Sequence, residues 1–548
     1  MTASPLQHFL RWENQCPNDI FLRQPVRREW MTYSWQQAGE EGRKLVEFLR
    51  KKGVNPGDRV AILSKNCAHW IMADIALMMG GYVSVPIYPT LTAGSIETIL
   101  THSESKAVIC GKLDDHAGQR KGIPGHIIHI GIEVYQTKGD HSWEQIMQEQ
   151  SPSAYMHTWE KEDLFTIMYT SGTTGKPKGV MHRAGSFDKV IDIAVSELKL
   201  PPRPALFSYL PLSHIAEKVG IEYNGLYNGA CFSFAETLDS FAKDLESVQP
   251  QCFFAVPRIW SKFREGILKK FSAKKLNTLL SIPLLGNFIR KKIKTKLGLG
   301  RATHIFSGAA PLPAETIAWF ETLGIRIYQA YGMTEDCVYA HFEREGIRRI
   351  GSVGKPLKGL KTKITAEGEL LVKSDCLMMG YYKEPELTAE VMDTDGYFKT
   401  GDKVAYDHDG FLFITGRVKD QFKTDKGKYI SPAPIEMELL NHEIIEQVCV
   451  VGMGIPQPLA LITLNEIGTN KTKEEIDQML TAALEQINQT LEHHEKLEKA
   501  VVMKESWTVE NGLLTPTMKV KRNEIEKIHQ HLYKEWFHQK ESVVWEKH

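Results

Sequence analysis

A short loop rich in glycine, threonine and lysine places the strongest constraint on this chain. Residues 169–179 read Tyr-Thr-Ser-Gly-Thr-Thr-Gly-Lys-Pro-Lys-Gly and follow an apolar run, 164–168, that predicts a buried strand. Glycines adopt backbone angles that other residues avoid, so successive N–H groups of the loop can turn toward one anion. The hydroxyls and lysines add donors and positive charge, which suits a polyphosphate. Pro177 breaks the Walker pattern, which requires Ser or Thr after the lysine.

Four further motifs follow the loop in order along the chain. They are Tyr331-Gly332-Met333-Thr334-Glu335, Thr400-Gly401-Asp402, Gly416-Arg417-Val418-Lys419-Asp420 and Thr515-Pro516-Thr517-Met518-Lys519. Together with the loop they resemble the adenylate-forming superfamily of acyl-CoA synthetases, adenylation domains and luciferases. The resemblance extends from Trp35 to Arg522, nearly the whole chain. It favours a phosphate-binding loop over a simple hairpin turn.

Composition excludes several other classes of protein. A chain of 548 residues is too long for one compact core, so we expect two or more domains. The formal net charge is zero, so no global field favours nucleic acid as a partner. Eight scattered cysteines lack the Cys-x-x-Cys spacing of zinc sites and fit a reducing compartment. Residues 1–18 lack the pattern of a secretory signal, so a cytoplasmic location is expected.

Strands and helices are expected to alternate over the first two thirds of the chain. Helical patterns at 36–52 and 70–79 and strand patterns at 60–63 and 83–87 predict an α/β fold with a mostly parallel sheet. Further strands are expected at 205–210, 251–256, 304–307 and 325–329. Beyond residue 350, Gly and Asp-Gly turns separate short strands, which predicts a small antiparallel or barrel-like β section.

The resemblance divides the chain into two domains. It implies a large N-terminal domain of doubly wound α/β sheets over residues 1–418, which includes the β section. A smaller, mobile α+β domain over 419–548 would carry the catalytic lysine, with Lys419 as the hinge. No carrier domain follows within the sequence, which disfavours a peptide-synthetase module.

The resemblance also assigns the residues that hold the phosphates of ATP and its Mg²⁺. The phosphate loop would use Thr170, Ser171, Gly172, Thr173, Thr174, Gly175 and Lys178. Thr170 and Glu335 would bind Mg²⁺, a metal that prefers oxygen ligands and needs only one or two carboxylates besides phosphates. The same Glu335 lies in a helix-start pattern, Thr334-Glu335-Asp336, and the two roles are compatible.

The rest of the nucleotide site is assigned in the same way. Tyr331 would stack on adenine, and Gly308, Ala309 and Ala310 would form the opposite wall. Asp402, at the end of a strand that closes in a tight turn, would accept the ribose hydroxyls. Arg417 offers a fork of donors for ribose and phosphate oxygens. Further ATP contacts are expected from Gln329, Ala330, Gly332 and Thr334, the last on the α-phosphate. Lys519 would be the catalytic lysine, reaching the α-phosphate and the substrate carboxylate.

Two positions match the acyl pocket of the family, and one segment suggests a lipid surface. His214 would line the pocket and Trp260 would gate it, although a structural histidine and a packed tryptophan are the ordinary alternatives. Residues 262–301 contain twelve Lys and Arg, a single acidic residue, Glu265, and interleaved apolar side chains. Such a segment has one of two roles. It either contacts the inner face of an anionic membrane, or it forms a pair of solvated helices that packs on the protein core.

The resemblance implies an ATP-dependent ligase that acts on a long-chain fatty acid. The acid would form an acyl-adenylate with release of pyrophosphate and then pass to CoA, which gives acyl-CoA and AMP. Lys426-Gly427 replaces a Gly-Gly pair in the loop that serves thioester formation, so another acceptor remains an alternative. A medium-chain or aryl acid is a second alternative. A non-catalytic protein that binds acyl lipids is a third, from a different class.

Overall fold

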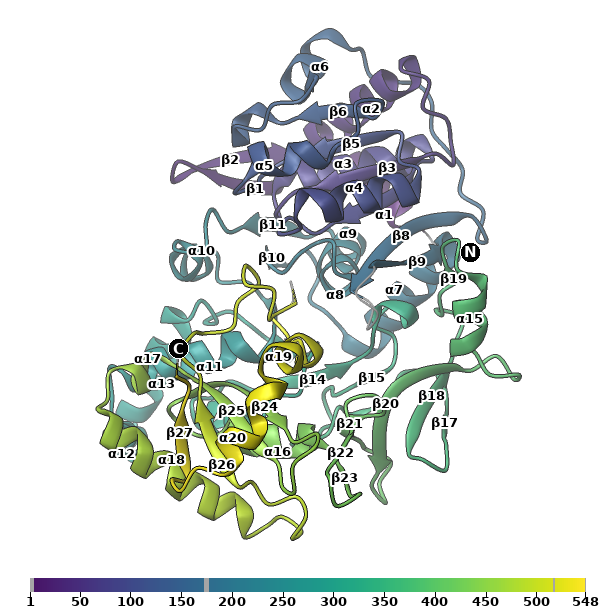
Figure 1. Cartoon of the computed structure of the whole chain (residues 1–548). Helices are drawn as coiled ribbons and strands as arrows, with labels where there is room; N and C mark the ends of the chain where they lie inside the picture. The colour runs from purple at the N-terminus through teal and green to yellow at the C-terminus, as the bar shows by residue number, and fades with distance from the viewer. Residues whose placement is uncertain (1–3, 172–176, 516–517, 548) are drawn as a thin grey trace.

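The predicted α/β class is confirmed in the computed structural model, which describes residues 4–171, 177–515 and 518–547 (Figure 1). Two large sheets form the N-terminal part of the chain. The first has nine strands in the order β16-β15-β14-β13-β12-β10-β11-β1-β2 and the second has eight in the order β19-β9-β8-β4-β3-β5-β6-β7. Neighbouring strands of the inner part of each sheet are parallel, and antiparallel pairs occupy the edges.

The bounds of these elements are as follows. The nine-stranded sheet contains β1 Ile20–Val26, β2 Glu29–Ser34, β10 Ala205–Ser208, β11 Cys231–Phe234, β12 Cys252–Ala255, β13 His304–Ser307, β14 Tyr328–Tyr331, β15 His341–Phe342 and β16 Lys355–Pro356. The eight-stranded sheet contains β3 Arg59–Leu63, β4 Val83–Ile87, β5 Ala107–Cys110, β6 Ile128–Gly131, β7 His141–Ser142, β8 Leu164–Ser171, β9 Pro177–Arg183 and β19 Gly380–Tyr381. The principal helices are α1 Pro5–Gln15, α2 Trp35–Lys51, α3 Ala68–Gly80, α4 Ala93–Ser103, α6 Trp143–Glu149, α7 Ala184–Leu198, α10 Phe241–Val248, α11 Pro257–Leu268, α12 Ala273–Ser281, α13 Leu285–Lys296 and α14 Ala314–Thr322.

Burial explains why these segments form a doubly wound fold. Strand β4 is buried along its whole length, as expected for an inner strand covered on both faces. Helix α3 is also wholly buried, while α2 has one apolar face and begins with a capping box between Ser34 and Gln37. No helix in the described part of the chain has both the length and the apolar character to cross a membrane.

A four-stranded antiparallel sheet represents the predicted β section. It is built from β17 Lys361–Ile364, β18 Glu369–Lys373, β20 Phe398–Tyr406 and β21 Leu412–Arg417. The expectation that the strand with Asp402 ends in a tight turn is wrong, because β20 continues to Tyr406. Gly401 adopts φ +72° and the pairing with β21 shifts after Lys403, so the bend is accommodated inside the ladder.

The C-terminal α+β domain has its own sheet and two cores. The strands β24 Ile445–Val451, β25 Leu459–Leu464, β26 Lys499–Val502 and β27 Val543–Trp545 form the sheet. A hairpin of β22 Phe422–Lys423 and β23 Tyr429–Ile430 precedes it, and the helices are α16 Pro432–Leu439, α17 Glu466–Thr469, α18 Lys473–Asn488, α19 Arg522–His529 and α20 Tyr533–Phe537. Separate apolar clusters cover the two faces, one around Leu480 and one around Trp507.

A buried ion cluster joins helix α3 to the segment that follows His214. Lys218 begins a π-helical turn, Lys218–Tyr223, and its Nζ lies 2.8 Å from Oδ2 of Asp74 and 3.7 Å from Oε2 of Glu222. All three side chains are inaccessible to solvent, and the hydroxyl of Ser84 donates to Asp74. Removing one partner of a buried ion pair is strongly destabilising, so the cluster fixes the path of this segment.

Candidate active site

The predicted phosphate loop falls between strands β8 and β9 of the eight-stranded sheet. Strands β8 and β9 are antiparallel, with Thr170 opposite Lys178. The predicted loop residues Gly172, Thr173, Thr174 and Gly175 lie outside the described part of the chain, as does the side chain of Ser171. Lys178 places its ammonium 5.4 Å from the ring centroid of Tyr381, a cation–π contact.

Tyr381 connects the phosphate loop to the predicted metal ligand. Its hydroxyl donates to Oε1 of Glu335 at 2.9 Å, while its ring faces Lys178. Glu335 therefore keeps Oε2 available for another donor or a cation. Sequence analysis missed Tyr381 because it belongs to none of the five motifs. The only signal was the Gly380-Tyr381 pair, which forms the short strand β19 against Met181 and Val180.

The carboxyl group of Asp336 stabilises the turn that contains Glu335. Thr334–Asp336 form a short 3-10 helix, in agreement with the helix-start pattern. Oδ1 of Asp336 accepts the backbone N–H groups of Met333 and Tyr339 at 2.8 and 3.1 Å. Burial, with a smaller effect of the neighbouring Glu335, raises the pKa of Asp336 to about 7 against the effect of these hydrogen bonds. Asp336 is thus a buried carboxyl group that shapes the loop.

Three residues from different motifs meet at one carboxylate. Tyr331 donates its hydroxyl to Oδ2 of Asp402 at 2.7 Å, and Nε of Arg417 donates to Oδ1 at 2.8 Å. Asp402 and Arg417 are direct partners across β20 and β21. The carboxylate raises the pKa of Arg417, so the guanidinium stays charged. Each carboxylate oxygen has a further lone pair, so Asp402 can still accept other donors.

The residues predicted to form the adenine wall, Gly308 to Ala310, follow strand β13, which pairs with β14. Gly308 leaves no room for a side chain, because a Cβ there would lie 2.8 Å from the carbonyl oxygen of Ala330 and 3.2 Å from the ring of Phe254. Ala309 adopts φ +67°, an uncommon conformation for a residue with a Cβ, and Ala310 follows it. Gln329 supports the wall by donating its amide to the carbonyl of Ser352 at 2.7 Å.

Lys519 reaches this group of residues from the C-terminal domain. Desolvation lowers its pKa and Arg417 adds to that effect, while Asp402 and Glu335 act in the opposite direction. The residue as a whole is exposed, but protein atoms surround its side chain closely enough to desolvate the ammonium. The preceding residue, Met518, has φ +66°, and the backbone N–H of Lys519 donates to Oγ1 of Thr515 at 3.0 Å.

The remaining predicted residues lie apart from this charged group or at its margin. Burial, with a smaller effect of Lys519, lowers the pKa of His214 to about 3, and Ala216 donates its N–H to Nδ1. Trp260 is fully buried against Phe253, Phe263 and Phe320, with its ring tilted steeply to each. Lys419 follows the end of β21, before β22. The acyl-pocket and hinge roles stay predictions.

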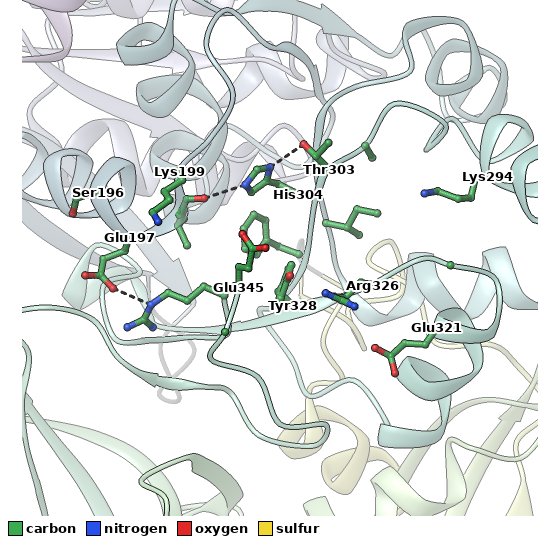
Figure 2. Close-up of a pocket in the computed structure, with 17 residues that line it drawn as sticks. Ser196, Glu197, Lys199, Lys294, Thr303, His304, Glu321, Arg326, Tyr328 and Glu345 are labelled. Atoms are coloured by element: carbon green, nitrogen blue, oxygen red, sulfur yellow. Dashed lines mark hydrogen bonds and ion pairs between the residues drawn. The ribbon is translucent and has the colours of Figure 1, made fainter.

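A separate cavity of about 1110 Å³ opens beside the other ends of β13 and β14 (Figure 2). Its lining includes Lys199, Lys294, Arg326, Glu321 and Glu345, and none of the site residues predicted from the sequence. Phe306 and Tyr328 form part of the wall, each two residues before Gly308 and Ala330 on the same strand face. The charged lining distinguishes this cavity from a channel for an apolar chain.

Comparisons with known proteins cover most of the chain. Residues 9–382 match the model of the AMP-binding enzyme family, and residues 419–541 match that of the AMP-binding enzyme C-terminal domain. The chain is 28% identical to the long-chain-fatty-acid–CoA ligase FadD15 of Mycobacterium bovis, over 93% of each protein. It is 29% identical to long chain acyl-CoA synthetase 2 of Arabidopsis thaliana, over 95% of this chain and 90% of the relative.

Solved structures share the fold at lower identity. The adenylation domain of a carboxylate reductase from Mycobacterium chelonae superposes with a TM-score of 0.82 and 20% identity, over 98% of this chain and 91% of that domain. The anthranilate CoA ligase AuaEII, in complex with anthranoyl-AMP, superposes with a TM-score of 0.79 and 20% identity, over 96% and 97% of the two chains.

Replacing Asp336 with asparagine should flatten the dependence of stability on pH. An aspartate in the unfolded chain loses its proton near pH 3.8, whereas the folded group keeps it up to about pH 7. The wild-type protein therefore loses stability as pH rises through this window, by at most about 4 kcal/mol. The asparagine of the variant can accept the same two N–H groups and does not titrate. Denaturant unfolding from pH 4.5 to 7.5 measures the difference.

The matched control for this experiment is Asp239→Asn, since Asp239 is exposed on the loop before α10. Its unfolding curve should shift with pH as the wild-type curve does. Parallel curves for Asp336→Asn and wild type would contradict the assignment of a protonated, buried carboxyl group.

Proposed function

Since the chain belongs to the AMP-binding enzyme family, among its acyl-CoA ligases, we propose that it activates long-chain fatty acids. A carboxylate oxygen attacks the α-phosphorus of ATP, and the bond to pyrophosphate breaks. The sulfur of CoA, after losing its proton, then attacks the acyl carbonyl, and AMP leaves. ATP and CoA are co-substrates, and the fatty acid is the third partner.

The charged group around Asp402 is the observation that supports adenylation best. Bringing a fatty carboxylate to a triphosphate requires positive charge that is already in place. Lys519, Arg417 and Lys178 supply that charge around one space. In this proposal Lys519 holds the α-phosphate and the carboxylate oxygen together, and Asp402 accepts the ribose hydroxyls.

The other residues position the nucleotide. Adenine stacks on Tyr331 against the wall of Gly308, Ala309 and Ala310. Thr170, Lys178 and the loop between them hold the β- and γ-phosphates. Glu335 and Thr170 present the oxygen donors that Mg²⁺ prefers, and Glu335 has an oxygen free of Tyr381. Bound there, Mg²⁺ would neutralise phosphate charge.

The names of the curated relatives support specificity for long-chain fatty acids. The alternative of an aryl acid substrate is supported by a protein of similar structure. FadD15 and the Arabidopsis synthetase are named for long-chain acids, whereas AuaEII is an anthranilate ligase. Transfer of the acyl group to an acceptor other than CoA is the second candidate. The reason is that Lys426-Gly427, at the tip of the β22–β23 hairpin, replaces the Gly-Gly pair of the loop that serves thioester formation. We propose the long-chain acid and CoA because the curated relatives match at higher identity over nearly the full chain.

We also propose a cytoplasmic enzyme that touches an anionic membrane, on its inner face, through part of 262–301. Helices α12 and α13 pack on the core through Leu276, Leu280 and Ile293, as a helical pair. The connecting turn and the first turn of α13 expose an apolar tip, formed by Ile282, Leu284, Leu285 and Phe288. Leu284 is 85% exposed, and the exposed Lys291 and Lys292 follow on α13. Apolar side chains beside lysines suit the surface of an anionic bilayer.

A panel of acids should show that activity rises with chain length. A buried methylene contributes about 0.8 kcal/mol, nearly fourfold per group when fully buried. We therefore expect kcat/KM for AMP release to increase from short to long fatty acids and to exceed that for benzoate and anthranilate. Greater activity with an aryl acid would replace the long-chain assignment. AMP release that requires no CoA would favour another acceptor.

Lys519→Ala should abolish the first half-reaction and spare the second. Loss of one preorganised cationic contact to a transition state costs about 10² to 10³ in rate. ATP–pyrophosphate exchange should fall by at least this factor. Transfer of a supplied acyl-adenylate to CoA should persist, since the proposed rotation moves Lys519 away. Lys521→Ala, two residues further along, is the control. Equal losses in both half-reactions would contradict the role of Lys519.

Placing two aspartates at the apolar tip, Leu284→Asp with Phe288→Asp, should release the enzyme from anionic vesicles. Both side chains are exposed, so the fold should tolerate the change, and the expected loss of binding is at least about tenfold. Vesicle sedimentation at low and high salt measures it. Leu238→Asp is the matched control, because Leu238 is 86% exposed and lies before α10. A wild-type protein that stays in the supernatant at low salt would contradict the membrane contact.

A further inference from the structure

Helix α11 lies beside the C-terminal domain, close to α17 (Figure 1). Two cations, one at its start and one just after its end, form ion pairs with acidic residues of that domain. At its first turn, Nη2 of Arg258 lies 2.6 Å from Oε1 of Glu446 on β24. Just beyond its end, Lys269 forms an ion pair with Glu466 at the start of α17. Between them, burial lowers the pKa of Arg264, and the charges of Glu315 in the large domain and, less strongly, Glu443 in the C-terminal domain act in the opposite direction. Two ion pairs therefore join the domains at the two ends of α11, and in both the cation belongs to the large domain and the carboxylate to the C-terminal domain.

Arg258 differs from the other two cations because it also touches the segment of Lys519. Its Nη1 lies 3.9 Å from Sδ of Met518, the residue directly before Lys519. Met518 has a left-handed backbone conformation, which neighbouring contacts must hold in place. The guanidinium of Arg258, in the large domain, thus contacts both the C-terminal sheet and the side chain that precedes the proposed catalytic lysine.

The position of Arg258 in its helix is unfavourable without this partner. Pro257 is the first residue of α11, so Arg258 lies at the positive end of the helix dipole, where a cation is destabilising. Glu446 supplies the compensating charge. Both side chains are only about one-fifth exposed, 21% each, so solvent screens the pair incompletely. The positive charge of Arg258 is therefore stabilised by Glu446 of the C-terminal domain, whereas the dipole of its own helix disfavours it.

We propose that Arg258 is a positioning residue for adenylation, acting through Glu446 and Met518. It stabilises the orientation of the C-terminal domain that brings Lys519 to Asp402 and Arg417. The inference rests on the proposed function of Lys519. Rotation of the C-terminal domain for thioester formation would separate Arg258 from Glu446, so the ion pair favours one half-reaction only.

Charge reversal and charge exchange test this role. Arg258→Glu places a second carboxylate against Glu446, and Glu446→Arg places a second cation against Arg258. Each should slow ATP–pyrophosphate exchange about tenfold, within the range of coupling between contacting residues. Arg258→Glu combined with Glu446→Arg should recover most of the exchange rate. Transfer of a supplied acyl-adenylate to CoA should be unchanged or faster in each single variant.

Lys262→Glu is the matched control, since Lys262 is exposed on the same helix, one turn beyond Arg258. It makes the same type of charge change and should leave both half-reactions at the wild-type rate. Thermal unfolding of each variant shows whether the fold is retained. Arg258→Ala, which adds no repulsion, should give a smaller loss of exchange in the same direction.

Failure of this inference is distinguishable from failure of the proposed function. Exchange by the wild type together with undiminished exchange by Arg258→Glu would overturn the inference alone. Equal losses in both half-reactions, or no recovery in the exchanged pair, would assign Arg258 a purely structural role and would also overturn it. Absence of exchange in the wild type with every acid would overturn the proposed function, and this inference with it.

Discussion

The candidate site depends on holding like charges together across two domains. Lys519 approaches Arg417, and this repulsion lowers the pKa of the lysine, together with the larger effect of desolvation. Asp402 and Glu335 act in the opposite direction and offset part of the repulsion. A polyanion would neutralise the remaining positive charge. The proposed binding of a nucleotide polyanion would therefore relieve a repulsion between the two domains.

Much of the fold could be predicted from local sequence. Strands β4 and β13 have the predicted bounds, because short apolar runs between turn residues specify buried strands. Strand β14 was predicted at 325–329 but spans Tyr328–Tyr331. Ile325 and Ile327 misled the prediction, since they are buried in the apolar cluster beside α14 rather than paired along their full length. Burial alone does not distinguish a strand from the segment that leads into it.

The site was predictable only in part, because its contacts are not local. Tyr331 and Asp402 are 71 residues apart, and no rule of sequence spacing predicts that they meet. Only the resemblance to a family assigned both residues to one site. Tyr381 and Arg258 stand outside the five motifs, and each is defined by partners that the fold brings together. The same holds for Lys218, whose partner Asp74 is 144 residues away. Sequence patterns identify residue types that suit a task, whereas only the fold shows which of them meet.

The order of strands in the nine-stranded sheet has a consequence for synthesis on the ribosome. Strand β1, at residues 20–26, pairs with β11, at residues 231–234, and β19, at residues 380–381, pairs with β9. Neither sheet can form completely until these distant segments have left the ribosome. The strands that are synthesised first therefore keep unpaired edges during translation. The C-terminal sheet, by contrast, draws all four strands from residues 445–545. The large domain is thus the part of the nascent chain with the greatest need of protection from aggregation.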